Sequence, residues 1–553
     1  MAMLTEDAPL MTEKGQFKGK VAIIGGGVAG ITAARVFKTQ GIDFTLFEAS
    51  DNLSGVWSQG YPGFAIQTPG KLYEFPDKRM PHPKDFKDGF LIKQYCDDYV
   101  ADHELEDSIK LRAEVVSVTR INHTKWKLLI QSGRGHTHSY EIFDFVVLAT
   151  GIYSPELRFI PKIEGVEHFK GNIFHSEDTA YIGDRTGKKV VIVGFGKSAQ
   201  DCAFNAYKES GGIPPLILFR KSHWCVPRKI FEKVPMQWLL YSRFGQGTLP
   251  LWQQCGPVEG FLHKMFYPCV WLYWRVVECA FTLQQGLYGS CSHLRPTMAI
   301  EDDMYCGHGI ICHPDFFPMI HEKKIGAVHS TIQRVLPTGQ LQLHDDSIIE
   351  ADELVFATGF KRNFEFLPAC LLEKVESDGI YAYRNMIVPG VPNIAFLNSN
   401  VTTFSNITTP AIQSAWLAEL INGNIALPPN IEEVVETEKK WRRKHLKHAG
   451  ESRAYLVQFQ QIRYWDSLLC DIGAEVKRKI SGYGIIGDAI SNFFVPVYSA
   501  DYKTIVTGEW KNHPNKTYPL KYIPSFWKEW SILGLLISIP VGVVSTTSYL
   551  TFR

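Results

Sequence analysis

The sequence predicts an α/β protein with two Rossmann-like domains, the first interrupted by the second, followed by a helical C-terminal region and an apolar tail. An apolar strand that runs into a glycine-rich turn and a helix occurs twice, at residues 21–38 and 189–206. An apolar strand that ends in Ala-Thr-Gly also occurs twice. A chain of 553 residues is too long for one core, so two or three domains are expected.

The first glycine turn lies near the N-terminus. The apolar strand Val21–Ile24 runs into Gly25, Gly27 and Gly30, and a helical pattern follows at once. Gly25 permits the turn, Gly27 lets the backbone approach a pyrophosphate, and Gly30 lets the helix pack close to the strand. The next strand ends about 20 residues downstream on Glu48, whose carboxylate can hold an adenosine ribose. The pattern predicts a dinucleotide site; a glycine-rich turn without a ligand is the alternative.

The second glycine turn repeats the first with two changes. Gly194 and Gly196 again follow an apolar strand, but the small residue Ala199 replaces the third glycine. The next strand ends on Arg220 and Lys221 instead of an acid. A guanidinium can bind a 2′-phosphate through two hydrogen bonds, whereas a carboxylate repels it. The first unit therefore suits FAD and the second suits NADPH over NADH, unless Arg220 is only a solvated surface charge.

The two Ala-Thr-Gly sequences mark further places where the backbone can approach a cofactor. Thr150 and Gly151 end one strand, and Thr358 and Gly359 end the other. Because the two strand ends are alike, we expect the chain to return to the first domain at residue 325. The expected domains are 19–165 (first segment of the FAD-binding domain), 166–324 (NADPH-binding domain with an apolar insertion at 230–292), 325–440 (second segment of the FAD-binding domain), 441–528 (helical C-terminal extension) and 531–550 (membrane anchor).

The segment after Glu48 carries two further candidate contacts. A small turn precedes Val56 and Trp57, where an aromatic wall can lie beside a flat ring; a Trp that fills the core is the alternative. Gln67 and Thr68 lie in an irregular, Pro-rich loop, and long structured loops often carry function.

Charge and cysteine content argue against several other classes. The formal net charge of +1 gives no electrostatic case for nucleic-acid binding. Eleven cysteines without a Cys-x-x-Cys pair indicate reduced thiols in a cytosol-facing protein. Cys306, His308, Cys312 and His313 match no common zinc spacing, so no metal site is expected.

Two apolar stretches suggest contact with a membrane. Residues 230–292 are rich in aromatic side chains but too interrupted to span a bilayer. Three interpretations stay open for these residues: they line a substrate passage, they rest in a membrane interface, or they form ordinary core. Residues 531–550 are uncharged, follow Trp527 and Trp530, and have the length of a span. We expect a tail anchor, ahead of a helix lying in the interface and of a buried terminal helix.

Two helical patterns lie in the C-terminal third. Residues 408–413 read as a helix start with Pro410 in the first turn, and its positive end could stabilise a reduced flavin. Residues 431–480 are amphipathic, and the basic run Lys439–Lys447 is expected to be a solvated face or to touch anionic lipid.

Together these motifs resemble the flavin-containing monooxygenases, the class B flavoproteins of microsomal type, over about residues 19–440. The linker from Phe169 through Gly171 to His175, between the two glycine turns, belongs to the resemblance. The resemblance implies an enzyme similar to the N,N-dimethylaniline monooxygenases, with FAD and NADPH as cofactors and O₂ as co-substrate. In this family NADPH reduces FAD, and the reduced flavin forms a C4a-hydroperoxide with O₂. The distal oxygen then passes to a soft nucleophile, an amine nitrogen or a sulfide sulfur of a small lipophilic substrate.

The resemblance also implies roles for individual positions. Gly25, Gly27, Gly30 and Glu48 match the FAD fingerprint, and Val56 with Trp57 match a flavin contact, although Ser54 stands where a second glycine is usual. Ser198, Ala199, Gln200 and Asp201 match the stretch that meets NADP, and Arg220 matches the arginine on the 2′-phosphate. Gln67, followed by Thr68, stands where many members place an Asn over the flavin, so Gln67 is the candidate catalytic residue. His175 is expected to support the domain linkage.

The alternatives are other redox enzymes and a scaffold. The sequence lacks a Trp-Pro after His175, which favours heteroatom oxygenation over a Baeyer–Villiger or oxidative-decarboxylating reaction. An NADPH-dependent disulfide reductase would need a cysteine pair that the sequence lacks. A membrane-bound NADPH-sensing scaffold would require an inactive flavin site. The apolar tail resembles the anchor of microsomal members and implies a cytosol-facing protein on the endoplasmic reticulum; an oligomer is compatible with the sequence.

Overall fold

The computed structural model contains the first predicted Rossmann-like sheet. It describes residues 17–512 and 520–521, apart from 62, 82–85, 123, 134–136, 154–156, 182, 306–309, 312, 363–364 and 481–483. Five parallel strands have the order β20-β7-β1-β2-β3. The strands are β1 (Lys20–Ile24), β2 (Asp43–Phe47), β3 (Ile109–Lys110), β7 (Phe145–Leu148) and β20 (Ile394–Phe396). Buried apolar residues fill β1 and β7, as expected for parallel strands covered on both faces.

The second sheet is also parallel, with the order β15-β10-β9-β19-β8. Its strands are β8 (Asn172–His175), β9 (Val190–Val193), β10 (Leu216–Phe219), β15 (Gly326–His329) and β19 (Glu353–Phe356). The expected return to the first sheet at residue 325 is wrong, because β15 pairs with β10 and β19 pairs with β9. The chain rejoins the first sheet only at β20, beside β7.

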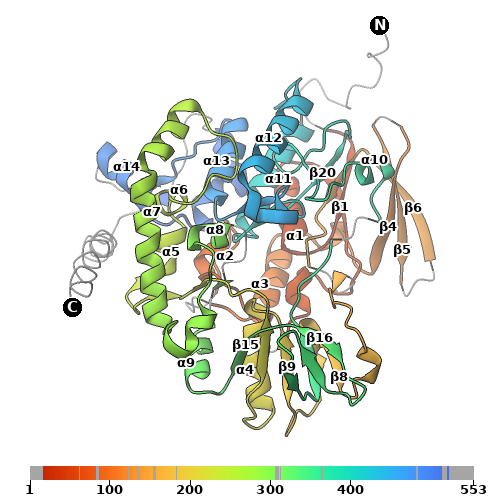
Figure 1. Cartoon of the computed structure of the whole chain (residues 1–553). Helices are drawn as coiled ribbons and strands as arrows, with labels where there is room; N and C mark the ends of the chain where they lie inside the picture. The colour runs from red at the N-terminus through yellow and green to blue at the C-terminus, as the bar shows by residue number, and fades with distance from the viewer. Residues whose placement is uncertain are drawn as a thin grey trace.

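The two sheets therefore belong to two copies of one arrangement (Figure 1). Helix α1 (Val28–Thr39) joins β1 to β2, and helix α4 (Lys197–Glu209) joins β9 to β10. An antiparallel three-stranded sheet precedes the Ala-Thr-Gly strand of each copy. These sheets are β4 (Ala113–Arg120), β5 (Trp126–Ser132) and β6 (Thr137–Phe143) in the first unit, and β16 (Ile332–Val335), β17 (Leu341–Leu343) and β18 (Ile348–Ile349) in the second.

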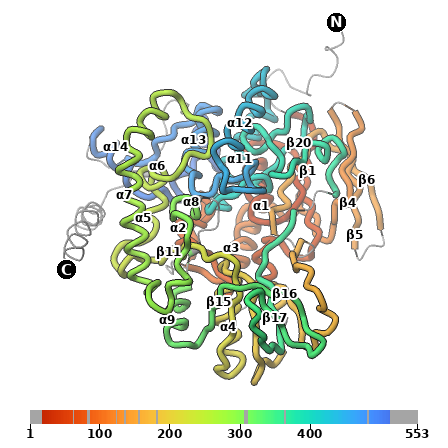
Figure 2. Tube along the Cα trace, viewed as in Figure 1, coloured from red at the N-terminus to blue at the C-terminus, as the bar shows by residue number. Residues whose placement is uncertain are grey.

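An inserted helical region separates β10 from β15 and lies along one flank of the molecule (Figure 2). Its longest element is α7 (Pro257–Gln285), which continues through Pro268. The C-terminal half of α7 is buried around Trp274 and Phe281, whereas the N-terminal half is largely exposed. The shorter elements are β11 (Cys225–Val226), β12 (Lys229–Ile230), β13 (Val234–Pro235), α5 (Met236–Leu240), α6 (Arg243–Gly247), α8 (Ile300–Tyr305), β14 (Ile310–Ile311) and α9 (Phe316–His321).

The C-terminal region is mainly helical where the structure describes it, and it packs on both the first unit and the insertion. Helix α11 begins at Thr408, as predicted, and packs on α1 and α13, while α14 packs on α6. The elements of the C-terminal region are β21 (Thr402–Thr403), α11 (Thr408–Ile421), α12 (Ile431–His445), β22 (Leu456–Gln458), α13 (Gln461–Asp471), β23 (Lys479–Ile480), α14 (Gly484–Phe494), α15 (Lys503–Thr507) and β24 (Leu520–Lys521). The first unit also contains α2 (Gly70–Tyr73), α3 (Gly89–Asp102) and α10 (Ala369–Leu372).

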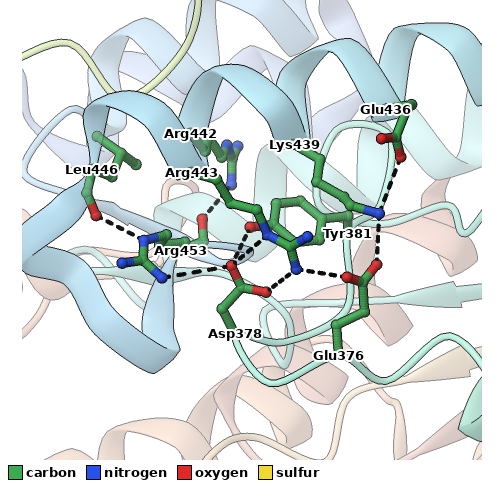
Figure 3. A network of polar contacts seen from close by, with 9 residues as sticks. All are labelled: Glu376, Asp378, Tyr381, Glu436, Lys439, Arg442, Arg443, Leu446 and Arg453. Atoms are coloured by element: carbon green, nitrogen blue, oxygen red, sulfur yellow. Dashed lines mark hydrogen bonds and ion pairs between the residues drawn. The ribbon is translucent and has the colours of Figure 1, made fainter.

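The basic run on α12 is not simply a solvated face. Figure 3 shows Lys439 and Arg443 directed at the loop that carries Glu376 and Asp378, whereas Arg442 is directed at Arg453. Lys439 pairs with Glu376 at 2.9 Å, and Arg443 pairs with Asp378 at 2.6 Å. Arg442 is buried and also donates to backbone oxygens. The ion pairs of Lys439 and Arg443 and the backbone bonds of Arg442 fix α12 to the body of the protein, so the expectation of solvation fails for these three side chains.

Two expectations concern regions of the chain that the structure covers incompletely. Among the described residues, no helix has both the length and the apolarity that crossing a bilayer requires. The predicted anchor at 531–550 lies outside the described residues. The described residues also contain no group of three or more metal-ligating side chains, and Cys306, His308 and Cys312 lie outside them.

Candidate nucleotide-binding sites

The first glycine turn has the geometry that dinucleotide binding requires. Gly25 has φ +108°, and a Cβ there would lie 2.5 Å from the carbonyl oxygen of Ala149. A Cβ on Gly30 would lie 1.9 Å from the oxygen of Gly25, so only glycine fits. At Gly27 the nearest atom to a Cβ is 3.7 Å away, on Gly55. The turn is therefore closed toward the sheet at Gly25 and Gly30, and has room at Gly27, where a pyrophosphate would approach.

The Glu48 carboxylate is hydrogen-bonded to the backbone of this turn. Its carboxylate accepts hydrogen bonds from the backbone N–H of Gly26 at 2.6 Å and of Ser50 at 2.9 Å. One oxygen holds the glycine turn, the other holds the loop that follows β2, and each keeps a lone pair for a further donor. A ribose hydroxyl can use that remaining capacity, so the predicted ribose contact is compatible with the observed bonds.

Val56 and Trp57 lie in a short 3₁₀ turn, Gly55–Ser58, beside Gly27. The Trp57 side chain is buried, and its indole N–H donates to the Tyr73 hydroxyl at 2.8 Å. These contacts place Trp57 in the core of the first unit, the alternative that the sequence left open. Ser54, before this turn, has φ +82°, a backbone conformation that explains why glycine is usual there.

Gln67 and Thr68 lie where the first unit meets the insertion. The Gln67 side-chain oxygen accepts a hydrogen bond from the backbone N–H of Ile311 at 3.3 Å, so it contacts strand β14. The Thr68 side chain is 2% exposed, and its hydroxyl has no hydrogen-bond partner among the described residues. A buried hydroxyl without a partner is costly, so Thr68 fits a bound polar group.

The second glycine turn follows the first closely. Gly194 has φ +138°, and a Cβ there would lie 2.5 Å from the oxygen of Ala357, the counterpart of Ala149. A Cβ on Gly196 would meet no atom within 4 Å, so this turn too has room for a phosphate. Ala199 is fully buried at the position of Gly30, which shows that this copy has space for one methyl group.

The predicted NADP-contacting residues on α4 separate into two groups. Gln200 is buried, and its side chain bonds to the backbone N–H of His313 at 3.2 Å and to the Cys225 sulfur at 3.2 Å. Asp201 is 3% exposed and is bonded to Tyr61. These two side chains are committed to protein contacts, whereas Ser198 is half-buried at the open start of the helix.

Arg220 and Lys221 are exposed at the end of β10. No ion pair of either side chain occurs within the described ranges, and the bond recorded at Arg220 is to its backbone oxygen, from His329 at 2.7 Å. An exposed guanidinium at the strand end that follows a glycine turn is free to bind a 2′-phosphate.

The two Ala-Thr-Gly sequences occupy equivalent places, one in each sheet. Gly151 has φ +67° and Gly359 has φ +78°, and a Cβ on either would meet no atom within 4 Å. Thr150 is exposed, and the Thr358 hydroxyl donates to the backbone oxygen of Phe159. Thr358 and Gly359 therefore belong to the second unit, not to the first as the sequence suggested.

His175 joins β8 to the second Ala-Thr-Gly. It is fully buried, and its Nε2 donates to the Gly359 oxygen at 3.1 Å, while Nδ1 accepts from the backbone N–H of Glu177 at 3.4 Å. Burial is the main cause that lowers the pKa of His175. A neutral ring with a defined tautomer supports the predicted linking role.

Tyr61 and the strand Ile310–Ile311 were not among the predicted site residues. Tyr61 bonds to Asp201, while Ile311 and the adjacent His313 bond to Gln67 and Gln200. The Tyr-Pro-Gly turn after Trp57 was a local signal for Tyr61, but its partner lies 140 residues away, so local patterns do not reveal the pair.

A chain with two such units, one closed by an acid and one followed by an arginine, belongs to the class of flavoproteins that bind two dinucleotides. The family model described as flavin-binding monooxygenase-like matches residues 18–250 and 315–517. The protein is therefore a member of this family, a flavin-dependent monooxygenase that uses FAD and NADPH. The stretch between the two matched segments, 251–314, contains α7.

Curated relatives agree with this assignment. The chain is 27% identical to a probable flavin-containing monooxygenase 1 of Arabidopsis thaliana, over 88% of this chain and 96% of the relative. It is 26% identical to human flavin-containing monooxygenase 3, over 90% of each chain.

Solved structures share the fold. S-allyl-L-cysteine S-oxygenase from Allium sativum matches with a TM-score of 0.56 and 16% identity, covering 96% of this chain and 99% of that one. A steroid monooxygenase bound to NADP matches with a TM-score of 0.61 and 16% identity, covering 82% of this chain and 98% of that one.

Proposed function

We propose that this monooxygenase transfers an oxygen atom to the nitrogen or sulfur of a small lipophilic amine or sulfide. FAD would lie on the first glycine turn, with its ribose at Glu48, and NADPH on the second, with its 2′-phosphate at Arg220. When bound, FAD takes a hydride from NADPH and activates O₂. The chain supplies two open turns, together with a Thr68 hydroxyl and an Arg220 guanidinium that have no side-chain partner in the part of the chain that the structure describes.

The observation that carries the two-nucleotide assignment is the repeated space above Gly27 and Gly196. At both positions a Cβ would meet no atom closer than 3.7 Å, while a Cβ on Gly25 or Gly194 would lie 2.5 Å from a carbonyl oxygen next to the neighbouring strand. The start of α1 or α4 lies beside each open position, with free N–H groups that favour phosphate.

Heteroatom oxygenation is distinguished from its rival by products. The related structures include both an S-oxygenase and cyclohexanone monooxygenase, so the fold serves either reaction. The full-length protein with FAD and NADPH is incubated with a tertiary amine, a thioether and a cyclic ketone, and products are identified by mass spectrometry. We expect N-oxide and sulfoxide. An ester from the ketone, with neither of the other products, would replace this proposal by the Baeyer–Villiger alternative.

We further propose that the insertion rests on a lipid surface, with the protein facing the cytosol at the endoplasmic reticulum. Large apolar side chains are exposed along the first half of α7 and on α14, and together they form what we call the apolar face. Its residues are Val258, Phe261, Leu262, Met265, Phe266, Tyr267, Trp271, Leu272, Ile485, Ile486 and Phe493. Val258 is 74% exposed and Ile485 is 89% exposed.

The two helices are joined at this face. Phe244 of α6 contacts both Tyr273 of α7 and Phe493 of α14, with ring centroids 6.1 and 6.0 Å apart. Exposed apolar side chains on two helices linked in this way indicate a binding surface, and their Trp, Tyr and Phe content is typical of membrane interfaces. The described chain ends at β24, which pairs with β23, and β23 packs on α14; in the sequence, the apolar stretch 531–550 begins ten residues after Lys521.

Hydrogen exchange of the full-length protein tests this contact. Phosphatidylcholine vesicles should slow exchange at residues 258–272 and 484–494 and leave α12, which carries no residue of the apolar face, unchanged. Unchanged exchange at the apolar face while the protein cosediments with vesicles would assign membrane binding to the tail alone.

A further inference from the structure

The two nucleotide-binding units touch through a loop of the first unit that lies on α4 of the second. The loop contains Tyr61 and Gly63 and follows Trp57. Tyr61 meets Asp201, and Gly63 lies close to Asn205, one helical turn further along the same face of α4. The loop therefore contacts the helix that begins at the second glycine turn.

A buried hydrogen bond forms the centre of this contact. The Tyr61 hydroxyl donates to a carboxylate oxygen of Asp201 at 3.0 Å and lies 3.4 Å from the Ser198 hydroxyl. The other Asp201 oxygen pairs with Lys197. Both Tyr61 and Asp201 are almost fully buried. A charge-assisted hydrogen bond with this burial holds its two elements in one geometry.

Aromatic packing connects Tyr61 to the first glycine turn. The Tyr61 ring contacts Phe64 with centroids 5.2 Å apart, and Phe64 contacts Trp57 at 4.8 Å. Trp57 belongs to the turn that lies beside Gly27. A continuous row of side chains therefore runs from the first glycine turn to the start of α4, which follows the second.

The protonation states suit this bond. Burial, followed by the charge of Asp201, raises the pKa of Tyr61 well above its ordinary value, so the hydroxyl remains a donor. Lys197 is a cation next to the carboxylate and supplies the opposite charge.

We propose that Tyr61 is a positioning residue for hydride transfer, and that it acts by holding α4, through Asp201, at a fixed place relative to the flavin turn. The inference rests on the proposed placement of FAD on the first unit and NADPH on the second. Hydride transfer requires donor and acceptor atoms in near contact, and a displacement of about 1 Å can cost roughly 100-fold in rate. In this proposal Asp201 holds α4 in place, whereas the sequence resemblance assigned it to NADP binding.

Anaerobic stopped-flow reduction of the FAD-loaded, full-length enzyme by NADPH tests the proposal. Tyr61→Phe should lower the limiting rate of flavin reduction about 10-fold or more. Its FAD content should stay unchanged, and its Kd for NADP⁺ should stay within about two-fold, because the hydroxyl that this substitution removes is buried and bonded to Asp201. The matched control is Tyr381→Phe, which removes another Tyr–Asp hydrogen bond, of 2.8 Å to Asp378, in the network of Figure 3.

Two further variants separate positioning from general stability. NADPH should reduce the flavin of Asp201→Asn faster than that of Asp201→Ala, because asparagine keeps an acceptor for the Tyr61 hydroxyl. In the double variant Tyr61→Phe with Asp201→Ala, the limiting rate of flavin reduction should be no lower than in Asp201→Ala alone, because the two changes remove the same interaction. In Tyr61→Phe, hydrogen exchange at residues 197–201 should also be faster than in the wild type, whatever cofactor is bound.

The outcomes are distinct. Reduction of Tyr61→Phe at the wild-type rate, or equal slowing in Tyr381→Phe, would overturn the positioning role. Unchanged exchange at residues 197–201 would overturn the contact itself. A wild-type protein that binds no flavin, or whose flavin NADPH does not reduce, would instead refute the proposed function.

Discussion

The two nucleotide-binding units share a backbone plan and differ in how the end of the second strand is used. In the first, Glu48 bonds to the backbone of the glycine turn at Gly26 and to the backbone of its own loop at Ser50. In the second, Arg220 is exposed and forms no ion pair within the described residues. One residue fixes the protein's own turn, and the other remains available to an arriving ligand. The difference suits one cofactor that stays bound and one that exchanges.

The third position of each glycine motif differs in the same direction. Gly30 lies so close to the Gly25 oxygen that no side chain fits, whereas Ala199 occupies its place in the second unit without exposure. The first helix therefore packs against its strand more closely than the second does. A tighter turn leaves less freedom to adapt to an exchanging ligand.

The largest expected effect follows from this packing difference. Gly30→Ala places a methyl group 1.9 Å from a carbonyl oxygen, so the turn must shift, and we expect loss of FAD and of soluble folded protein. The reciprocal change, Ala199→Gly, should cost about 0.5–1 kcal/mol through helix propensity and lost packing. Flavin absorbance per polypeptide and thermal unfolding measure both variants.

These two variants break the comparison if they behave alike. A soluble, yellow Gly30→Ala protein with a normal melting temperature would show that the turn relaxes freely. Severe destabilisation by Ala199→Gly would show that the second turn is as tightly constrained as the first.

Changes at the two strand-end residues, Glu48 and Arg220, should have smaller effects. The first should lower stability, and the second should lower the affinity for NADPH. Glu48→Ala leaves two backbone N–H groups without their acceptor, so we expect a loss of about 1–3 kcal/mol in stability and weaker FAD binding. Arg220→Ala should leave the melting temperature unchanged and raise the Kd for NADPH about 10- to 100-fold, with little change for NADH, because only NADPH carries the 2′-phosphate.

Isothermal titration with both nucleotides and a urea unfolding curve distinguish the pair. Equal losses for NADH and NADPH in Arg220→Ala would show that this residue does not recognise the 2′-phosphate. An unfolding midpoint for Glu48→Ala equal to that of the wild type would show that the carboxylate does not hold the turn.

Local signals predicted the units well, because a strand, a glycine turn and a helix are all encoded within about 30 residues. They failed where the deciding partner is distant. The Ala-Thr-Gly at Thr358 looks the same whichever sheet its strand joins, and only pairing with β9 places it in the second. The bond between Asp201 and Tyr61, 140 residues apart, likewise has no local signal, and the predicted NADP contact of Asp201 stays a prediction. The basic run on α12 looked solvated because Glu376 and Asp378 lie about 60 residues earlier.

The smallest expected effect concerns the linker, which has its role in the second unit. The His175 ring donates from Nε2 to Gly359, the counterpart of Gly151, and accepts at Nδ1, and the second contact requires the neutral ring. Burial lowers the pKa of His175 in the folded protein below the ordinary value of about 6.5 that applies when unfolded. Below about pH 6.5 the unfolded chain takes up a proton that the folded ring does not, so this residue's contribution to stability falls as pH falls. Above about pH 6.5 it is constant.

Replacing His175 by Gln keeps an N–H donor and removes the titration. The difference in unfolding free energy between wild type and His175→Gln should be constant above about pH 6.5 and should shrink, or reverse in favour of the variant, as pH falls toward about 5. Urea midpoints measured at several pH values give this difference, and the other histidines cancel because both proteins contain them. A difference that grows at low pH would mean that the charged ring is the better bound form. In that case the second Ala-Thr-Gly is held by an imidazolium, and the linker geometry described for the neutral tautomer is wrong.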